Sequence, residues 1–135
     1  MKQIIQKTMR VAVIQLLYIS AGLGQSAAGD IAFTAYNGDG GDDFAFVTLV
    51  AISSGTVIYF TDNEWDGDAF NNTNEGYVTW TATSNLDAGS VIVVTDPNAT
   101  ESVNTGTVSE TGSFDLGASN ECLFALSAAP ATSYG

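Results

Sequence analysis

The chain has very few basic residues and no histidine. Its three basic residues, Lys2, Lys7 and Arg10, lie within the first ten positions, whereas all fifteen Asp and Glu residues lie beyond position 29. Residues 29–135 therefore carry a formal side-chain charge of −15 and no cationic side chain. Nucleic-acid binding relies on Lys and Arg to neutralise phosphates, and so does attachment to anionic membrane surfaces. The composition therefore excludes nucleic-acid binding through phosphate neutralisation and argues against attachment to anionic membrane surfaces.

A surface without cations cannot form salt bridges within residues 29–135. The repulsion between its carboxylates has to be relieved by spacing, by salt or by bound cations. Two interpretations remain open at this stage, namely cation binding and solubility in salty surroundings.

Cysteine is almost absent as well, because Cys122 is the only one. An internal disulfide is impossible, and a lone cysteine in an exported chain is either buried or free to bond another molecule. Cys122 begins the apolar, strand-like run Cys122–Leu126, so we expect it to be buried. A cysteine nucleophile normally needs a histidine base, which this chain lacks.

No apolar run is long enough to span a bilayer. The longest near the N-terminus, Val11–Ile19, follows the three basic residues and has the length of a signal-peptide core. Ser26 and Ala28 fit the small-residue rule for a cut after position 28. We predict that residues 1–28 form a cleaved signal peptide. A cut after Gly24 and an amphipathic first helix are the alternatives.

The rest of the chain alternates short apolar runs with Gly, Asn, Asp and Ser clusters, which is typical of a β-sandwich. Phe44–Ile52 is apolar on both faces, so we expect a central strand there, and the alternation around Trp80 predicts that this side chain lies in the core. The fold class we predict is all-β, a single antiparallel immunoglobulin-like sandwich over residues 29–135. The predicted strands are Ile31–Tyr36, Phe44–Ile52, Thr56–Thr61, Tyr77–Ala82, Ser90–Thr95, at most a short strand near Val103–Val108, Phe114–Leu116 and Leu123–Leu126.

Several segments together resemble a module of secreted and surface bacterial proteins. They are Gly29–Asn37, Asp43–Val47, Tyr59–Trp65, Gly76–Thr81, Leu86–Val91, Gly112–Leu116 and Leu123–Ala125. That module is similar in plan to the lamin-tail type of immunoglobulin-like β-sandwich. The resemblance implies an exported, non-catalytic accessory module at the front of a larger secreted or cell-surface protein. Such a module serves in adhesion, binding or spacing.

The C-terminal stretch, Pro130–Gly135, reads as a loop without a closing strand. An exported sandwich usually pairs its last strand, because an open sheet edge promotes aggregation. We therefore expect further domains downstream in the same polypeptide.

One polar loop has the pattern of an oxygen-ligand site. Asp62, Glu64, Asp66 and Asp68 alternate along it, and carboxylates at alternate positions near a glycine suit calcium. The bidentate acid of an EF-hand is missing, since Thr73 stands in its place. We predict these four residues as candidate calcium ligands outside any EF-hand. A solvated acidic loop is the alternative.

A second acidic cluster comprises Asn37, Asp39, Asp42 and Asp43. Because Asx and Gly residues are what a hairpin turn requires, the pattern favours a turn over a metal site.

The aromatic residues offer a different kind of site. Trp65 stands in a polar loop, and with Tyr59, Phe70 and Tyr77 it could present a face on which sugar rings stack. Trp65 is therefore the candidate ligand-binding residue and polysaccharide the candidate ligand. The alternative function is a carbohydrate-binding module attached to a downstream hydrolase.

No catalytic motif is present. The sequence contains no Gly-rich phosphate loop, no nucleophile elbow and no histidine-based metal site. Glycoside hydrolysis needs two carboxyls about 5–9.5 Å apart across a cleft, and a small sandwich offers little cleft. We expect a secreted or cell-surface module that is not an enzyme.

Overall fold

The computed structural model describes residues 27–70, 75–118 and 121–130. Most of the predicted signal peptide, up to residue 26, lies outside the described residues, as do residues 131–135 of the predicted open end. Within the described ranges the regular elements are all strands, and no helix there has the length and apolar character to cross a membrane.

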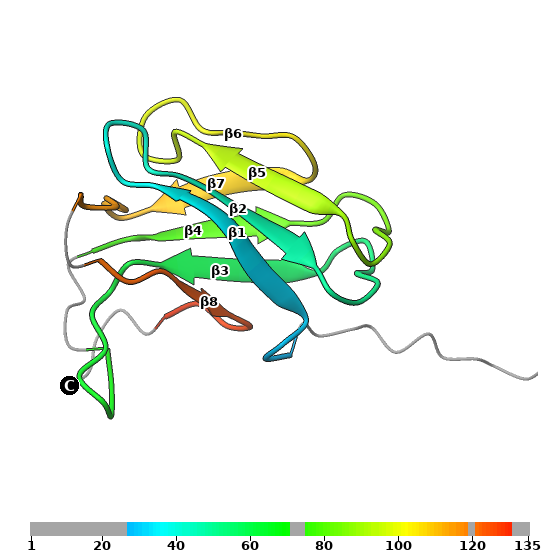
Figure 1. Ribbon diagram of the computed structural model, residues 1–135, viewed down its shortest axis with the longest axis horizontal. Helices are drawn as coiled ribbons and strands as arrows, with labels where there is room; N and C mark the ends of the chain where they lie inside the picture. Colours follow the sequence, from blue (N-terminus) through cyan, green and yellow to red (C-terminus); the bar gives the residue numbers. More distant parts are fainter. Residues whose placement is uncertain (1–26, 71–74, 119–120, 131–135) are drawn as a thin grey trace, which may run out of the picture.

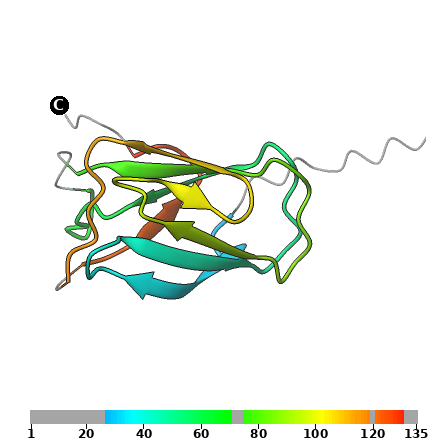
Figure 2. The same cartoon turned by 90° about the horizontal axis from the view of Figure 1, so that it is seen from above.

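The eight strands form two antiparallel sheets that face each other (Figures 1 and 2). One sheet has the order β1-β2-β5-β6 and the other β7-β4-β3-β8. The all-β, two-sheet prediction is thereby confirmed. The strands are β1 (Ile31–Asn37), β2 (Asp43–Thr48), β3 (Val57–Thr61), β4 (Tyr77–Thr81), β5 (Val91–Thr95), β6 (Ser102–Val103), β7 (Thr107–Thr111) and β8 (Phe124–Leu126).

The core lies between the sheets and is built from alternate residues of the four inner strands. Phe44 and Phe46 of β2 face Phe60 of β3, with ring centroids 4.8 and 5.0 Å apart. Each fully buried side chain of this size contributes about 1.5–3 kcal/mol through burial alone. The buried cluster contains Phe44, Phe46, Ile52, Ile58, Phe60, Val78, Trp80, Ala82, Ile92, Val94, Phe114 and Leu116.

The central strand of the first sheet is β2, which pairs with β1 on one side and β5 on the other. This confirms the prediction of a central strand from an apolar run. The predicted end at Ile52 is wrong, because the strand stops at Thr48 and Leu49 and Val50 are exposed. Ile52 is buried but belongs to an isolated bridge with Leu86.

Trp80 of β4 is fully buried, as predicted from the alternation of its strand. Its indole stands edge-on to Phe46, and its Nε1 donates a 2.8 Å hydrogen bond to the carbonyl of Thr105. Gly106 follows with a φ of +91°, and any Cβ there would lie 2.5 Å from the indole nitrogen. Only glycine therefore fits the turn that covers the tryptophan.

Two predicted strands are wrong in detail. Val103–Val108 is split between β6 and β7, which belong to different sheets, because the turn at Gly106 separates them. Phe114–Leu116 forms no strand, yet Phe114 and Leu116 are completely buried. Their side chains close the core while their backbone passes across its end.

Cys122 is exposed, which contradicts the predicted burial. The last strand begins two residues later, at Phe124. Cys122 therefore lies in the connection before β8, where no sheet face covers its side chain.

The two ends of the sandwich differ sharply in charge. One end, here named the acidic end, holds the connections at 38–42, 62–70 with 75–76, 96–101, and 112–118 with 121–123. Every acidic residue except Asp30 and Asp87 lies in these connections or in the strand residues beside them. The opposite end holds the connections at 49–56, 82–90 and 104–106.

Candidate functional site

The predicted calcium loop begins as a small hairpin at the acidic end. Trp65 and Phe70 form an antiparallel bridge, and the Asp66 N–H donates to the Ala69 carbonyl at 3.1 Å. Asp66 Oδ1 accepts the N–H groups of Asp68 and Ala69, both at 2.9 Å. These bonds hold the pKa of Asp66 below its usual range. The Asp-Gly-Asp sequence thus builds a turn here.

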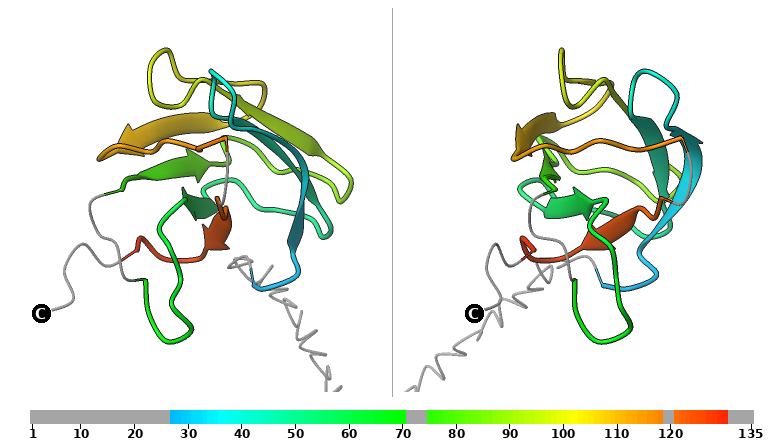
Figure 3. Two further views of the ribbon diagram at one scale, coloured as in Figure 1. Left: turned by 60° about the vertical axis from the view of Figure 1, so that its left-hand side comes forward. Right: turned by 90° about the vertical axis from the view of Figure 1, so that its left-hand side faces the viewer.

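The hairpin presents Trp65 to solvent. Its side chain is 49% exposed and rests edge-on against Phe70, with ring centroids 5.0 Å apart. Phe70 is buried and packs in turn on Phe124 of β8, at 5.3 Å. The loop after β3 extends away from the sheets (Figure 3), and this stack of rings ties it back to the β-sandwich.

Tyr59 and Tyr77 form a second aromatic pair on the outer face of the β3–β4 ribbon. Their ring centroids lie 5.8 Å apart. In the register of the sheet, Tyr59 is the partner of Leu126, and Phe124 is the partner of Thr61. The four predicted aromatic residues therefore fall into two pairs on one side of the molecule. Sequence reasoning missed Phe124, which the chain supplies from a distant strand.

Asp62 lies directly below the hairpin and is only 1% exposed. Its Oδ2 accepts the Asp115 N–H at 2.8 Å, whereas Oδ1 is buried without a hydrogen-bond partner. Burial, together with the smaller effect of the negative charges of Glu75 and Glu121, raises the pKa of Asp62 to about 6 against the opposing backbone hydrogen bonds. Near neutral pH the ionised form is therefore costly.

The base of the loop is fixed by a neutral cluster next to Asp62. The Thr61 hydroxyl donates to the Gly76 carbonyl at 2.9 Å and accepts from the Asn63 side-chain amide at 2.9 Å. Asn63 is itself buried, and its Oδ1 has no hydrogen-bond partner. Two neighbouring side chains thus each have a buried oxygen without a hydrogen-bond partner.

Asp42 is a second buried carboxyl at the acidic end. Its Oδ2 accepts a hydrogen bond from the Asn98 side-chain amide, and the carboxyl also accepts a hydrogen bond from the backbone of Leu116. Burial, followed by the charge of Asp115, raises its pKa. Tyr36 stands nearby and donates to the Gly117 carbonyl at 2.9 Å. Burial raises the pKa of Tyr36, as do the charges of Glu121, Asp42 and Asp62, in that order.

The other predicted cluster serves the hairpin turn between β1 and β2. Asn37 accepts from the Asp39 N–H and donates to Asp43, both at 3.3 Å. The second Asp43 oxygen accepts the Asp96 N–H at 2.9 Å. These contacts agree with the turn interpretation of the pattern.

The four predicted calcium ligands are not gathered into one group. Asp62 is buried, whereas the side chains of Glu64, Asp66 and Asp68 are exposed. Among the residues that the structure describes, no three acidic or cysteine side chains are arranged to hold a metal ion.

Comparisons with family models, with curated proteins and with solved structures found no significant match for this chain. The fold places it among two-sheet antiparallel β-proteins.

Proposed function

We propose that this chain is a non-catalytic binding module of an exported or cell-surface bacterial protein, and that it binds polysaccharide through Trp65. The observation that carries the proposal is the half-exposed indole on a hairpin that Phe70 fixes to β8. An exposed tryptophan that is held by a buried ring costs little conformational entropy on binding. It offers the flat apolar surface that a sugar ring covers.

The charges beside Trp65 restrict the class of polysaccharide. Glu64, Asp66 and Asp68 are exposed around it, and residues 29–135 contain no cationic side chain to offset them. Acidic polymers are therefore repelled. A neutral polymer is the ligand class that the site favours.

The location and family belong to the same proposal. The basic N-terminal segment with its apolar core supports export. The sequence segments between Gly29 and Ala125 that were named above resemble the lamin-tail type of immunoglobulin-like module. The two antiparallel sheets are compatible with that plan. The module would act as an accessory to domains further along the same polypeptide.

Retention on insoluble cellulose, chitin and an acidic polymer tests the binding proposal. We expect the protein to be retained on a neutral polymer and Trp65→Ala to bind at least about tenfold more weakly, since exposed aromatic anchors dominate such interfaces. Val91→Ala, at a similarly exposed site on the other sheet, should bind as the parent does. No retention on any neutral polymer, or equal retention of Trp65→Ala, contradicts the proposal.

Calcium is the ion proposed to order the loop above Asp62. The buried Oδ1 atoms of Asp62 and Asn63 support it, because both are hard oxygen donors without a hydrogen-bond partner. We expect millimolar calcium to raise the melting temperature relative to chelator. Binding to the folded state alone stabilises by about 2.7 kcal/mol at a hundred times Kd.

Two variants sharpen this test. Asp62→Asn should abolish the calcium-dependent rise, whereas Asp87→Asn, at the opposite end, should keep it. Identical melting curves in calcium and in chelator would remove calcium from the proposal without touching the polysaccharide site.

A further inference from the structure

Every residue of β4 and β7 that points away from the core carries a hydroxyl group. These strands alternate between core-facing side chains, such as Trp80 and Val108, and outward-facing ones. The outward-facing residues are Tyr77, Thr79 and Thr81 of β4 and Thr107, Ser109 and Thr111 of β7. The surface that they form, here named the hydroxyl face, contains no Asp or Glu. The matching face of the first sheet instead carries apolar residues, including Val91 and Val93.

The strand register orders this surface in rows. Thr79 lies opposite Tyr59 of β3 on one side and opposite Ser109 of β7 on the other. Neighbouring strands are about 4.8 Å apart, so an aromatic ring and two hydroxyl groups follow one another at even steps across the sheet. Tyr77 lies opposite Thr111 in the next row, and its ring lies 5.8 Å from that of Tyr59 between centroids. The hydroxyl face thus begins at a pair of aromatic rings.

Other rings connect the hydroxyl face with Trp65. Phe124 of β8 shares the outer face of the second sheet with Tyr59, because Leu126, two residues further on, is the partner of Tyr59. Phe70 packs on Phe124, and Trp65 packs on Phe70. From β8 to β7 the sheet spans three strand spacings, or about 14 Å. A flat ligand that covers Trp65 can therefore continue over the aromatic pair and onto the hydroxyl face.

The protein itself does not engage the hydroxyl groups of this face. Among the described residues, the Ser and Thr side chains of the hydroxyl face make no hydrogen bond to another protein group. The buried Thr48 and Thr61 hydroxyls, by contrast, donate to backbone carbonyls. A free hydroxyl can donate one hydrogen bond and accept two, as the hydroxyls of a sugar also do. The face can therefore exchange solvent for the hydroxyls of a sugar.

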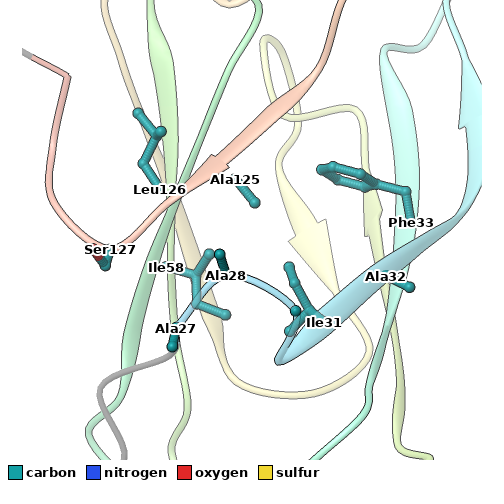
Figure 4. Close-up of a pocket in the computed structure, with 10 residues that line it drawn as sticks. Ala27, Ala28, Ile31, Ala32, Phe33, Ile58, Ala125, Leu126 and Ser127 are labelled. Atoms are coloured by element: carbon teal, nitrogen blue, oxygen red, sulfur yellow. The ribbon is translucent and has the colours of Figure 1, made fainter.

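The cavity between β1 and β8 offers a sugar no comparable surface. Its volume is about 390 Å³, and its lining side chains are apolar except for Ser127 (Figure 4). Residues 27–29 of the same chain already form part of its wall. A sugar in this cavity would lose the hydrogen bonds of its hydroxyls to water without replacing them. The outer face of the second sheet is therefore the surface that suits a sugar.

We infer that a neutral polysaccharide held at Trp65 continues across the outer face of the second sheet, so that several consecutive sugars of one chain are bound. This inference rests on the proposed polysaccharide binding and specifies its ligand as a linear neutral polymer bound along its length. The rings of Tyr59 and Tyr77 stack against apolar sugar faces, and the hydroxyl face pairs with sugar hydroxyls. A second copy of the chain suits this surface less well, because packed sheets bury apolar faces and both copies are strongly acidic.

The length of the oligosaccharide tests the inference directly. The probes are cellohexaose and the hexasaccharide of N-acetylglucosamine, each compared with its own disaccharide in NMR titrations of the purified protein. We expect at least one hexasaccharide to bind at least about tenfold more tightly than its disaccharide, because only the longer chain reaches β7. It should shift the resonances of Thr79 and Ser109, whereas the disaccharide shifts only those near Trp65. The resonances of Val91 and Val93 should stay in place with every probe.

A double variant removes hydrogen-bonding groups and keeps the rings. Thr79→Val combined with Ser109→Ala deletes two hydroxyls at outward-facing strand positions, and valine has a high β propensity. We expect this variant to bind the hexasaccharide about tenfold more weakly and the disaccharide as the parent does. The control, Thr95→Val, removes the same group at an exposed position of β5 on the other sheet and should bind both sugars as the parent does. Trp65→Ala should weaken the binding of both.

Two results would overturn the inference while the polysaccharide proposal stands. They are equal affinities for hexasaccharide and disaccharide, and an unchanged hexasaccharide affinity in the double variant, each with Trp65→Ala still losing binding. If none of these sugars binds, the polysaccharide proposal fails and the inference fails with it.

Discussion

The two ends of the sandwich close the same core in opposite ways. At the opposite end, the buried Thr48 hydroxyl donates to the Asp87 carbonyl at 2.8 Å and accepts the Ser90 N–H at 3.1 Å. At the acidic end, the buried Asp62 carboxylate accepts one N–H from Asp115 and leaves its second oxygen without a partner. A neutral hydroxyl satisfies a few backbone groups at any ordinary pH. A buried carboxylate makes the end that it closes sensitive to protons and cations.

The acidic end also shows how a folded domain without cationic side chains accommodates its carboxylates. Glu110 accepts the Phe114 N–H at 2.8 Å, Glu101 accepts the Glu110 N–H at 3.0 Å, and Asp43 accepts that of Asp96. Backbone N–H groups thus occupy the place that Lys and Arg take in other proteins. Such charge-assisted bonds are among the stronger hydrogen bonds.

The largest effect should come from removing the ring of Phe114, which closes the core at the acidic end beside the Asp115–Asp62 hydrogen bond. Phe114 is completely buried and its neighbour Asp115 donates to Asp62. We expect Phe114→Ala to lower the free energy of unfolding by about 3–5 kcal/mol through the cavity it leaves. Urea denaturation followed by tryptophan fluorescence measures this loss. A loss below about 1 kcal/mol would show that the segment 113–117 does not close the core.

The next largest effect concerns pH. The pKa of Asp62 is about 6 in the folded protein against an ordinary 3.8, so the protonated carboxyl favours folding. This stabilisation is complete below pH 3.8 and is lost as the pH rises through 6. It amounts to roughly 3 kcal/mol at most. In chelator, the melting temperature should therefore rise between pH 8 and pH 5.

Asp62→Asn isolates this contribution from that of the other carboxylates. At pH 8 in chelator the variant should melt above the parent, because it removes a costly buried charge. The difference should shrink as the pH falls toward 4. Asp87→Asn, an exposed site at the opposite end, should follow the parent at every pH. If the melting temperatures of the parent and of Asp62→Asn changed in parallel with pH, Asp62 would not be the group that makes the acidic end sensitive to pH.

The smallest effect is expected at the opposite end. Thr48→Val keeps the shape of the side chain but removes its hydrogen bonds to the Asp87 carbonyl and the Ser90 N–H, while the Ser90 hydroxyl still donates to the Asp87 carbonyl at 2.7 Å. We expect a loss of about 0.5–1.5 kcal/mol in the free energy of unfolding, measured by thermal melts. The loss should be the same at pH 5 and pH 8. A pH-dependent loss would mean that the two ends are coupled.

The parts of this fold that sequence predicts are those that local patterns determine. Trp80 lies in the core because its strand alternates, and β2 is central because its run is apolar on both faces. The resemblance to a sandwich module led to the same two-sheet fold class.

The parts that escaped prediction depend on contacts between distant residues. Asp62 is buried because Asp115, 53 positions away, donates to it, and no local signal distinguishes it from the exposed Glu64. Phe114 and Leu116 are buried but form no strand. The apolar character of these two residues therefore predicted their burial correctly, but the strand predicted there is wrong. The hairpin of Trp65 and Phe70 depends on Phe124 from the last strand.

The uneven placement of carboxylates makes the molecule a long-range electric dipole, with its negative pole at the acidic end. A positively charged surface would turn the protein before the two make contact, and the field would act over roughly 10 Å at 0.1 M salt. The pole that arrives first carries Trp65.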